Sequence, residues 1–458
     1  MKNSSSSEIN QVISGGYCIG CGVCAAQTGG KMGLDQLGMY RPTLPKTEES
    51  ASQAAKVCPF TSAGGNEDQL AAERFPDAKS DSEIGRYYDL RVGHVTNPNT
   101  RNLSSSGGII TWLLQSLLEE DLVDYVVHIR EGDAEAMYRY GISETSEEVQ
   151  RGAKSRYYPV ELSQVIEKIR ERNGVTVVVA LPCFAKALRR MMKIDESLAK
   201  KIRFIVGVVC GHLKSSRYAD FLASQLGVDP SEDKQVDFRV KFPDGAASGY
   251  GFSVKADGKE EVRRMGTLFG NSWGLNLFRY PACDFCDDVF AECADFAVGD
   301  AWLPQYLPDP AGNSIMVIRD SLLSELVDQA SLSGELKVDQ ASLEDIKRSQ
   351  AGGLRDRREG LQYRLALKEK ENSWAPKKRV KARVDHLDRH RRKIYSLRSD
   401  LGNASHQLWQ EALRKDGFET FRKNVSPKAH QIMDLYRPLW KRPLVKLKRA
   451  LSSLSSSK

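Results

Sequence analysis

The sequence predicts a multidomain protein of the α/β or α+β class. Helix-like and strand-like patterns alternate through the middle of the chain, as they do when helices cover a sheet. Residues 1–65 are instead rich in Gly and Cys, and residues 346–458 are strongly basic. The chain has 458 residues, which is longer than a single hydrophobic core usually stabilises. We therefore expect two or three domains.

The N-terminal residues 1–65 show little apolar periodicity and many small polar side chains. This composition predicts a small module that is not held together by a large apolar core. Residues 66–85 are charged and are expected to form a covering segment or a linker.

The middle of the chain predicts buried strands between amphipathic helices. Short runs of Val and Ile, bounded by polar or Gly-containing segments, indicate strands that are buried on both faces. Strands are expected at 124–129, 175–181 and 203–210, and helices at 104–123, 160–174, 184–192 and 215–228. Between Val236 and about Leu268 the pattern changes to strand, turn and strand, which predicts a β-rich insertion.

The C-terminal part is a basic helical extension. Residues 351–458 hold 28 of the 67 Lys and Arg and 11 of the 60 Asp and Glu, so their net charge is +17 and that of the preceding residues is −10. We expect long helices interrupted at Pro427, Pro438 and Pro443. Such an asymmetry can indicate contact with an acidic protein or a membrane surface, but a solvated helical face is the commoner explanation, and no nucleic-acid partner is expected. For the stretch PLWKRPLVKLKRAL, a basic helical arm that lies on the acidic body is preferred over contact with an anionic membrane surface.

Four cysteines near the N-terminus have the spacing of a cluster-binding motif. Cys18, Cys21 and Cys24 lie in CIGCGVC, and Cys58 precedes Pro in VCPF. Three cysteines separated by two residues can wrap one corner of a [4Fe–4S] cluster, and a distant Cys-Pro supplies the fourth thiolate. A zinc site would favour two separated CxxC pairs, and a disulfide framework would favour an oxidising compartment. The polar N-terminus has no signal-peptide core, so we expect a cytoplasmic protein.

A second group of cysteines is scattered along the chain. Cys183 and Cys210 each follow a predicted buried strand, and Cys283 and Cys286 form a CxxC pair in PACDFCDD. Loops at the carboxyl ends of parallel strands gather at one edge of a sheet, so these four could converge. The alternative is that Cys183 and Cys210 are small buried apolar residues. The ninth cysteine, Cys293, is expected to be an unligated thiol, although it could replace one of the four.

A small-residue segment precedes the first predicted helix of the middle region. Ser104, Ser105, Ser106, Gly107 and Gly108 would let a phosphate approach a helix N-terminus, where N–H groups and the helix dipole favour an anion. The other interpretation is a capped helix with a Gly-rich turn.

Two further segments carry candidate polar residues. Lys154 and Ser155 in GAKSRYYP could add a cation and a hydroxyl at the same phosphate. His212, beside Cys210, is a weak candidate for a proton donor or for a hydrogen bond to a cluster sulfur, and a structural role is an equal alternative. Asp287, Asp288 and Asp300 are interpreted as turn caps without a catalytic role.

Taken together, several segments resemble the beta subunits of the coenzyme F420 hydrogenases and formate dehydrogenases, a family that includes 7-hydroxymethyl chlorophyll a reductases. The matching segments are CIGCGVC with VCPF, LSSSGGIITWLLQSLLEE, GAKSRYYPV, LPCFAKAL, VCGH and PACDFCDDVFAECADFAVGDAWLP. The chain departs from the family pattern at Phe184, where relatives tend to have Gln, and at Cys293. The basic tail is similar to that of bacterial members linked to polysaccharide genes.

The resemblance implies four parts and three cofactors. The parts are a ferredoxin-like [4Fe–4S] module at 1–65, a flavin-binding region at 85–165, a domain with a second cluster at 166–345, and the basic helical extension at 346–458. The second [4Fe–4S] cluster would be held by Cys183, Cys210, Cys283 and Cys286. FAD would be bound by the Ser104–Gly108 segment with Lys154 and Ser155.

The function implied by the resemblance is a flavin- and [4Fe–4S]-dependent oxidoreductase. Electrons from a ferredoxin or another one-electron donor protein would pass through the clusters to FAD and on to a small organic substrate or a deazaflavin. The alternative is an electron-transfer beta subunit of a larger hydrogenase or dehydrogenase complex without independent turnover. A homo-oligomer is compatible with both. No GxGxxG fingerprint opens a βαβ unit, so a nicotinamide-binding domain of the usual type is not supported.

Overall fold

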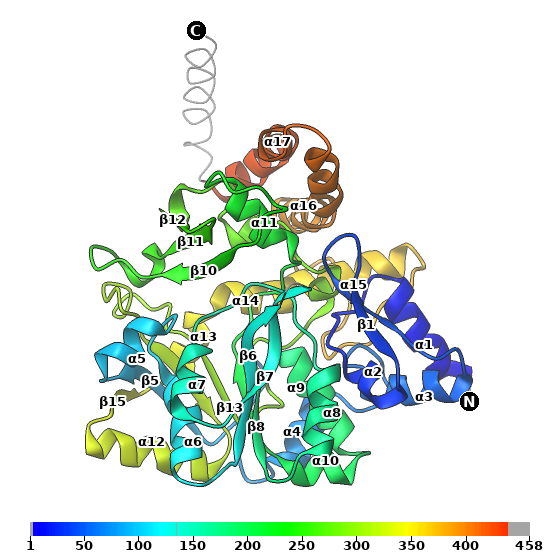
Figure 1. Cartoon of the computed structure of the whole chain (residues 1–458). Coiled ribbons are helices and arrows are strands. Elements are labelled where there is room, and N and C mark those ends of the chain that lie inside the picture. Colours follow the sequence, from blue (N-terminus) through cyan, green and yellow to red (C-terminus); the bar gives the residue numbers. More distant parts are fainter. Residues whose placement is uncertain (1–2, 134, 438–458) are drawn as a thin grey trace.

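An eight-stranded mixed sheet forms the centre of the computed structural model, which describes residues 3–133 and 135–437 (Figure 1). The strand order is β15-β5-β14-β13-β9-β8-β6-β7. The strands are β5 (Asp89–Val95), β6 (Tyr125–Asp133), β7 (Ala136–Ser143), β8 (Thr176–Ala180), β9 (Ile202–Val208), β13 (Phe296–Asp300), β14 (Ser314–Ile318) and β15 (Leu336–Gln340). The predicted α/β class is therefore confirmed.

The four inner strands β6, β8, β9 and β13 run parallel, so their carboxyl ends meet at one edge of the sheet. Strand β7 pairs antiparallel with β6, and β14, β5 and β15 continue the other side antiparallel. Successive residues of the inner strands point to opposite faces, and both faces are buried: Val177 and Val178 of β8 belong to different apolar clusters. This explains why the inner strands read as continuous apolar runs.

Helices cover both faces of the sheet. The apolar cluster on one face includes α6 (Ile109–Glu119), α7 (Ser146–Arg151) and α12 (Ser321–Ser333). The cluster on the other face includes α8 (Ser163–Glu171), α9 (Pro182–Met192), α10 (Glu196–Lys201) and α11 (Arg217–Ser224). The short α5 (Pro98–Leu103) precedes the Ser104–Gly108 segment.

The N-terminal segment packs beside the sheet domain (Figure 1, blue). Its elements are α1 (Asn3–Ser14), α2 (Val23–Thr28), β1 (Lys31–Leu34), β2 (Tyr40–Thr43) and α3 (Glu48–Val57). Apolar residues such as Val12 and Val57 join the same cluster as Phe184 of α9. The predicted covering segment folds as α4 (Glu67–Arg74), β3 (Lys79–Asp81) and β4 (Gly85–Tyr87). The N-terminal segment therefore shares the core of its neighbour.

A separate antiparallel sheet lies where the sequence predicts an insertion. It consists of β10 (Gln235–Val240), β11 (Gly251–Ala256) and β12 (Lys259–Arg264). Short 3-10 turns follow at η2 (Met265–Thr267), η3 (Trp273–Leu275) and η4 (Pro281–Phe285), after η1 (Ala247–Gly249) in the β10–β11 connection. The turn η4 carries the first cysteine of the CxxC pair.

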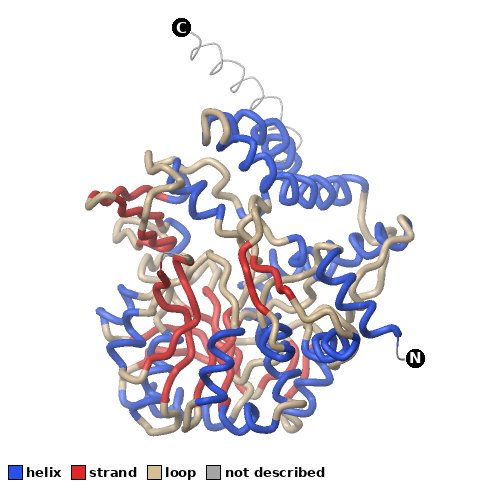
Figure 2. The backbone as a smooth tube through the Cα atoms, turned by 45° about the vertical axis from the view of Figure 1, so that its right-hand side comes forward, coloured by secondary structure: helices blue, strands red, loops and turns tan. Residues whose placement is uncertain are grey.

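The C-terminal extension wraps over the sheet domain and ends in two long helices. It contains α13 (Leu343–Ser349), α14 (Ala351–Arg355), a π-helical turn η5 (Asp356–Gly360), α15 (Leu361–Lys370), α16 (Arg389–Leu413) and α17 (Phe418–Tyr436). Helices α16 and α17 pack together above the insertion (Figures 1 and 2). Trp409 and Phe421 are fully buried between them and α11, with ring centroids 5.4 Å apart.

One helix boundary was predicted incorrectly. Pro427 does not interrupt the chain but lies inside α17, because packing of the apolar face of this helix against α16 outweighs the loss of one backbone hydrogen bond. Pro438, Pro443 and the PLWKRPLVKLKRAL stretch lie outside the described residues. Among the described helices, none combines the length and the apolar character required to cross a membrane.

The carboxylate of Asp295 holds the edge of the inner sheet to two helices. It is fully buried, contacts Arg189 of α9 at 2.5 Å and Arg74 of α4 at 2.9 Å, and accepts a hydrogen bond from the backbone N–H of Ile205 at 2.7 Å. Loss of one charge from a buried pair leaves the other charge without compensation.

We expect Asp295→Asn to lower the free energy of unfolding by about 3 kcal/mol, since the buried Arg189 would lose its counter-ion. Asp328→Asn is the matched control, because Asp328 pairs with Arg91 while 52% of its side chain is exposed, and it should cost less than about 1 kcal/mol. Denaturant unfolding followed by circular dichroism measures both. Equal effects of the two substitutions would contradict the assignment of Asp295.

Candidate functional site

The first four cysteines surround a small apolar cavity. Cys18, Cys21 and Cys24 lie in the loop before α2 and in its first turn, and Cys58 ends α3. All four are buried, and they line a small apolar pocket whose open space totals about 350 Å³, including the part exposed to solvent. The Gly20 N–H donates to the Cys18 sulfur at 3.4 Å. The arrangement brings four sulfurs together around one pocket, as the CxxCxxC spacing predicts.

Two glycines allow this loop to curl. Gly20 and Gly22 have φ angles of 71° and 82°, which disfavour any residue with a Cβ atom. A Cβ at Gly20 would also lie 2.6 Å from the Tyr40 carbonyl oxygen, and one at Gly22 would lie 2.8 Å from the Ser163 backbone nitrogen. The loop can therefore approach both β2 and α8 only with glycine at these positions.

Burial and mutual repulsion disfavour thiolates at this cavity unless positive charge is present. Burial raises the pKa of Cys58 to about 11, and burial together with Cys58 and Cys18 raises the pKa of Cys21. Iron in a cluster would supply the missing positive charge. Four sulfurs that line one apolar pocket fit a [4Fe–4S] cluster in their chemistry.

The second group of cysteines also comes together. Cys183 opens α9 after β8, Cys210 follows β9, and Cys283 and Cys286 belong to η4 and its end. Burial and then Cys286, Cys210 and Cys283 raise the pKa of the Cys183 thiol, which shows that the four thiols are electrostatic neighbours. The Leu213 N–H donates to the Cys283 sulfur at 3.4 Å. The structure therefore favours convergence over the interpretation of Cys183 and Cys210 as isolated apolar residues.

Cys293 lies in a different environment. It is buried, and its pKa is raised first by burial and then by Glu67 and Asp288. Within the described residues, no three His, Cys, Asp or Glu side chains form a group suited to a single metal ion. The sulfurs that hold a four-iron cube are farther apart than ligands of a single ion, because the cube lies between them.

The two cysteine groups are adjacent to each other. Cys21 contributes to the raised pKa of Cys183, and the hydroxyl of Tyr140 on β7 has its pKa raised by burial and then by both Cys183 and Cys21. Tyr140 donates to the Val179 carbonyl at 2.9 Å. It therefore occupies the space beside both groups, a position that no local sequence signal indicated.

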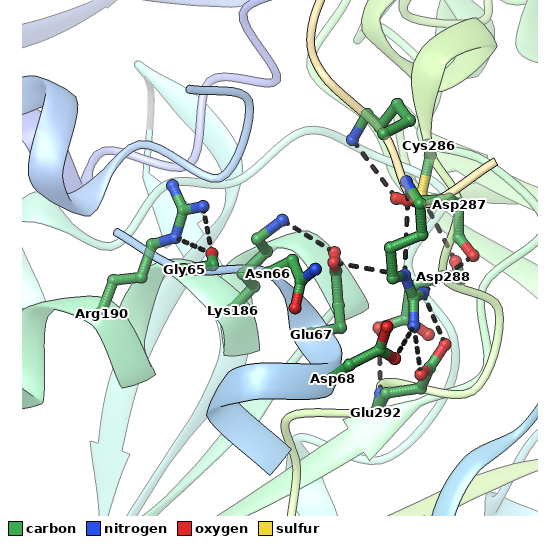
Figure 3. A network of polar contacts seen from close by, with 12 residues as sticks. Gly65, Asn66, Glu67, Asp68, Lys186, Arg190, Cys286, Asp287, Asp288 and Glu292 are labelled. Atoms are coloured by element: carbon green, nitrogen blue, oxygen red, sulfur yellow. Dashed lines mark hydrogen bonds and ion pairs between the residues drawn. The ribbon is translucent and has the colours of Figure 1, made fainter. Parts of the chain in front are cut away.

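A network of buried charges lies beside Cys286 (Figure 3). Asp287 contacts Lys378 at 3.3 Å and Arg379 at 3.4 Å, and Arg379 also contacts Glu292 at 2.6 Å. Burial opposes ionisation of Asp287, but Lys378 and Arg379 hold its pKa below its ordinary value. Asp287 is thus an ion-pair partner and not a turn cap, whereas Asp288 accepts from the Glu292 N–H at 2.9 Å as a cap does.

A large cleft opens at the carboxyl ends of the parallel strands. Its open space totals about 2730 Å³, including the part exposed to solvent. Of the residues predicted to bind a cofactor, its lining includes Ser104, Ser105, Ser106, Gly108, Lys154 and Ser155, and it also includes Cys210 and His212. The structure therefore brings the Ser104–Gly108 segment, which is the predicted phosphate loop, and one member of the second cysteine group to the same cleft.

The loop itself is held by hydrogen bonds. Ser105 Oγ accepts from the Ser155 N–H at 2.6 Å, which joins two predicted segments. Ser104 Oγ donates to the Thr100 carbonyl at 2.7 Å, and Ser106 Oγ donates to the Asn313 carbonyl at 2.8 Å. The N-cap residue of α6 is Gly108, which has no side chain to cap the helix, so no serine caps this helix in the described structure.

Gly107 and Lys154 make contacts within the protein that the sequence did not indicate. The Gly107 N–H donates to Ser314 Oγ at 3.2 Å, and a Cβ there would lie 2.6 Å from the Gly93 carbonyl, so this glycine serves close packing. Lys154 forms an ion pair with Asp237 at 3.0 Å. It is therefore a compensated cation at the edge of the cleft.

Arg239 and Asp300 were missed as cleft residues. Both guanidinium N–H groups of Arg239 bond Asp300 at 3.0 Å, and one also donates to the Ser105 carbonyl at 3.1 Å. The guanidinium stacks on Tyr250 at 4.2 Å. Asp300 ends β13, where it positions Arg239 against the phosphate loop and does not serve as a turn cap.

His212 is buried at the wall of the cleft beside Cys210. Its ring centroid lies 4.4 Å from that of Trp273, and its Nε2 has no hydrogen-bond partner among the described residues. Burial and then Lys214 and Arg279 lower its pKa well below the ordinary value. A neutral imidazole that can offer one N–H is the form that this environment favours.

The fold and the cleft define an α/β protein with a large cleft at the carboxyl ends of its parallel strands. Two family models match, both described as coenzyme F420 hydrogenase/dehydrogenase, beta subunit: the N-terminal model matches residues 91–167 and the C-terminal model matches residues 175–344. These matches cover more than half of the chain, and the chain belongs to this family.

Two relatives illustrate the likeness. The coenzyme F420 hydrogenase subunit beta of Methanothermobacter thermautotrophicus is 22% identical over 245 residues, which cover 51% of this chain and 81% of that protein. A solved structure of the F420-reducing [NiFe] hydrogenase complex from Methanosarcina barkeri, derivatised with xenon, matches with a TM-score of 0.48 and 17% identity. The match covers 68% of this chain and 100% of that chain.

His128 of β6 also lines the cleft, and it makes a pH-dependent contribution to stability. Burial lowers its pKa to about 4, and its Nε2 lies 2.8 Å from Ser143 Oγ. The unfolded chain therefore binds a proton between about pH 6.5 and pH 4 that the folded chain does not bind.

We expect the free energy of unfolding to fall by about 3 kcal/mol as the pH is lowered from 7 to 4, because protonation then favours the unfolded state. His128→Gln keeps a polar partner for Ser143 and removes the titration, so its stability should depend less steeply on pH. Denaturant unfolding at a series of pH values measures the difference. Parallel pH profiles for the two proteins would refute this role.

Proposed function

We propose that the chain is an electron-transferring oxidoreductase subunit that holds two [4Fe–4S] clusters and FAD. The first cluster would be held by Cys18, Cys21, Cys24 and Cys58, and the second by Cys183, Cys210, Cys283 and Cys286. Electrons from a ferredoxin or another one-electron donor would reach the flavin by this route and pass to a small organic molecule or a deazaflavin.

The observation that carries the proposal is the serial arrangement of three sites. Cys21 of the first group is an electrostatic neighbour of Cys183 in the second, and Cys210 of the second group lines the cleft that contains the Ser104–Gly108 loop. A redox chain requires neighbouring centres in this order. Clusters supply one-electron transfer, and a flavin converts single electrons into a hydride equivalent.

The protein's own groups would hold and tune these sites. Backbone N–H groups of Gly20 and Leu213 point at cysteine sulfurs, and hydrogen bonds to sulfur stabilise the more negative state of a cluster. Arg357 donates to the Cys210 carbonyl at 2.7 Å, and its charge interacts with Cys286 and Cys210. Arg239 would fix the phosphate loop through Ser105.

Family membership favours a subunit over a free-standing enzyme. The matched relative is by name a hydrogenase subunit, so a partner protein would deliver or receive electrons. All nine cysteines are free thiols, which suits a reducing compartment such as the cytoplasm.

A reductase that turns over a small substrate by itself is the second candidate. The observation that favours it is the extension, whose residues Arg355, Arg391 and Arg398 line the cleft together with residues of the family domains. A cleft lined by residues of two parts of the chain suits capture of a small molecule. Turnover of an organic substrate by the isolated chain, with no gain on adding a partner protein, would favour this candidate.

The first test is the iron content of cysteine variants. Cys21→Ala should lower anaerobically reconstituted iron by about four atoms per chain and leave FAD content unchanged, because the cleft does not include Cys21. Cys293→Ala is the matched control, a buried cysteine outside both groups, and should retain all iron. Chemical iron analysis and EPR of the reduced protein report the result. Undiminished iron in Cys21→Ala would remove the first cluster assignment.

The second test addresses the serial route. Reduced ferredoxin should reduce the bound flavin of the native chain, and Cys183→Ala should slow this step at least tenfold, since the route through the second group is interrupted. A small reductant such as dithionite should still reduce the flavin of the variant, which shows that the flavin remains bound. Anaerobic stopped-flow absorbance follows both reactions. Equal rates of reduction by ferredoxin would show that the second cysteine group is not on the route.

A further inference from the structure

The C-terminal extension supplies a basic wall to the cleft. Arg355 ends α14, Arg357 lies in η5, and Arg391 and Arg398 lie on α16, and all four line the cleft. The family matches end at residue 344, so these side chains belong to a part of the chain that the family description does not include.

Positive charge at the cleft exceeds negative charge. The lining has two acidic residues, Asp300 and Asp356. Against these stand eight basic residues: Lys154, Arg156, Lys214, Arg239, Arg355, Arg357, Arg391 and Arg398. A cleft lined by one sign of charge attracts ligands of the opposite sign.

On the body side the cations near the phosphate loop already have partners. Arg239 is paired with Asp300 at 3.0 Å and Lys154 with Asp237 at 3.0 Å. These pairs support the loop that would receive the phosphates of FAD. They do not account for the charge that the extension brings to the cleft.

On the extension side the arginines outnumber their partners. Asp356 contacts Arg279 at 3.2 Å, Arg364 at 3.3 Å and Arg398 at 3.5 Å. Asp284 also pairs with Arg279 at 3.0 Å, and Arg398 donates to Asn276 Oδ1 at 3.2 Å. Arg398 Nε is buried and has no hydrogen-bond partner among the described residues. The guanidinium of Arg355 is exposed and pairs with no carboxylate of the described chain. These are donors that a ligand could satisfy.

Arg391 is the third extension arginine, after Arg355 and Arg398, that a ligand could reach. Its guanidinium lies 2.8 Å from the Tyr395 hydroxyl and 3.2 Å from Glu359, whose side chain is 38% exposed. An ion pair this exposed contributes little to stability, so an anionic ligand can compete with Glu359 for Arg391. Tyr395 also lines the cleft and offers a hydroxyl beside the guanidinium.

One extension arginine, Arg357, lies beside the second cysteine group. Arg357 is committed to the Cys210 and Gly211 carbonyls at 2.7 Å each. Arg355, Arg391 and Arg398 remain to face a molecule in the cleft.

We propose that Arg355, Arg391 and Arg398 form an anion subsite that binds the phosphate or carboxylate group of the small molecule that reacts in the cleft. This inference rests on the proposed function, because it assigns a charge class to the molecule that exchanges electrons with the flavin. Guanidinium groups suit this role, since their planar forks match phosphate and carboxylate oxygens.

The flavin's own phosphates have the same chemistry, so the test separates the two sources. The protein is used with its full complement of iron and FAD, and inorganic pyrophosphate is the probe, titrated by calorimetry at fixed ionic strength. Arg355→Gln and Arg398→Gln should each raise the dissociation constant of pyrophosphate at least tenfold while FAD per chain stays unchanged. Arg414→Gln is the control: this residue is an exposed arginine of the same extension outside the cleft lining, and the affinity of this variant should equal that of the native chain.

Three outcomes would overturn the subsite. FAD loss in Arg355→Gln and Arg398→Gln would assign these arginines to the flavin. An equal weakening by Arg414→Gln would show nonspecific attraction to the basic extension. Absence of pyrophosphate binding to protein that retains iron and FAD would reject the subsite while leaving the proposed function standing, whereas absence of iron and FAD would reject the proposed function itself. Because Arg355 is exposed, its substitution leaves the fold intact and keeps the test decisive.

Discussion

Buried charge at the meeting point of four chain segments constrains the whole molecule. Glu67 of α4 contacts Lys186 of α9 at 3.0 Å, and Arg379 of the extension reaches Asp287 and Glu292 beside the CxxC pair (Figure 3). Charges removed from water are tolerated only with well-placed partners. The helix after the N-terminal segment, α9, the cysteine loop and the extension must therefore all be in position together.

Arg190 extends the same constraint to the first cysteine group. Its guanidinium donates to the Cys58 and Gly65 carbonyls and, at 3.1 Å, to the Thr61 carbonyl. Arg190 and Cys183 belong to the same helix, α9. Helix α9 therefore contacts the first cysteine group through Arg190 and contains Cys183 of the second. This explains how two sites built from distant segments keep a fixed separation.

The sequence indicated those parts of the fold and site that have local signatures. The CxxCxxC spacing predicted the first cysteine group, and uninterrupted apolar runs predicted the inner strands β8 and β9. Antiparallel strands such as β5 and β15 were not predicted, because their polar residues break the apolar pattern. Convergence of Cys183 and Cys210 with the CxxC pair depends on strand order, which spacing does not encode.

The missed site residues share one physical cause. Tyr140, Arg239 and Asp300 act through partners more than thirty residues away, so neither propensity nor motif marks them. The basic stretch that was expected to lie on the acidic body, PLWKRPLVKLKRAL, falls outside the described residues, whereas Lys378 and Arg379 of the described extension pair with buried carboxylates. The contribution of the extension to the cleft was not predicted, because charge composition does not tell which guanidinium groups face a ligand.

The family match stops at residue 344, while later residues still line the cleft. Residues of the matched region and residues of the extension therefore meet at one cleft, although they are encoded in consecutive stretches of the chain. Because Arg379 of the extension pairs with Asp287 and Glu292, a new terminal stretch in such a protein would have to keep these buried pairs while it changed the arginines at the cleft.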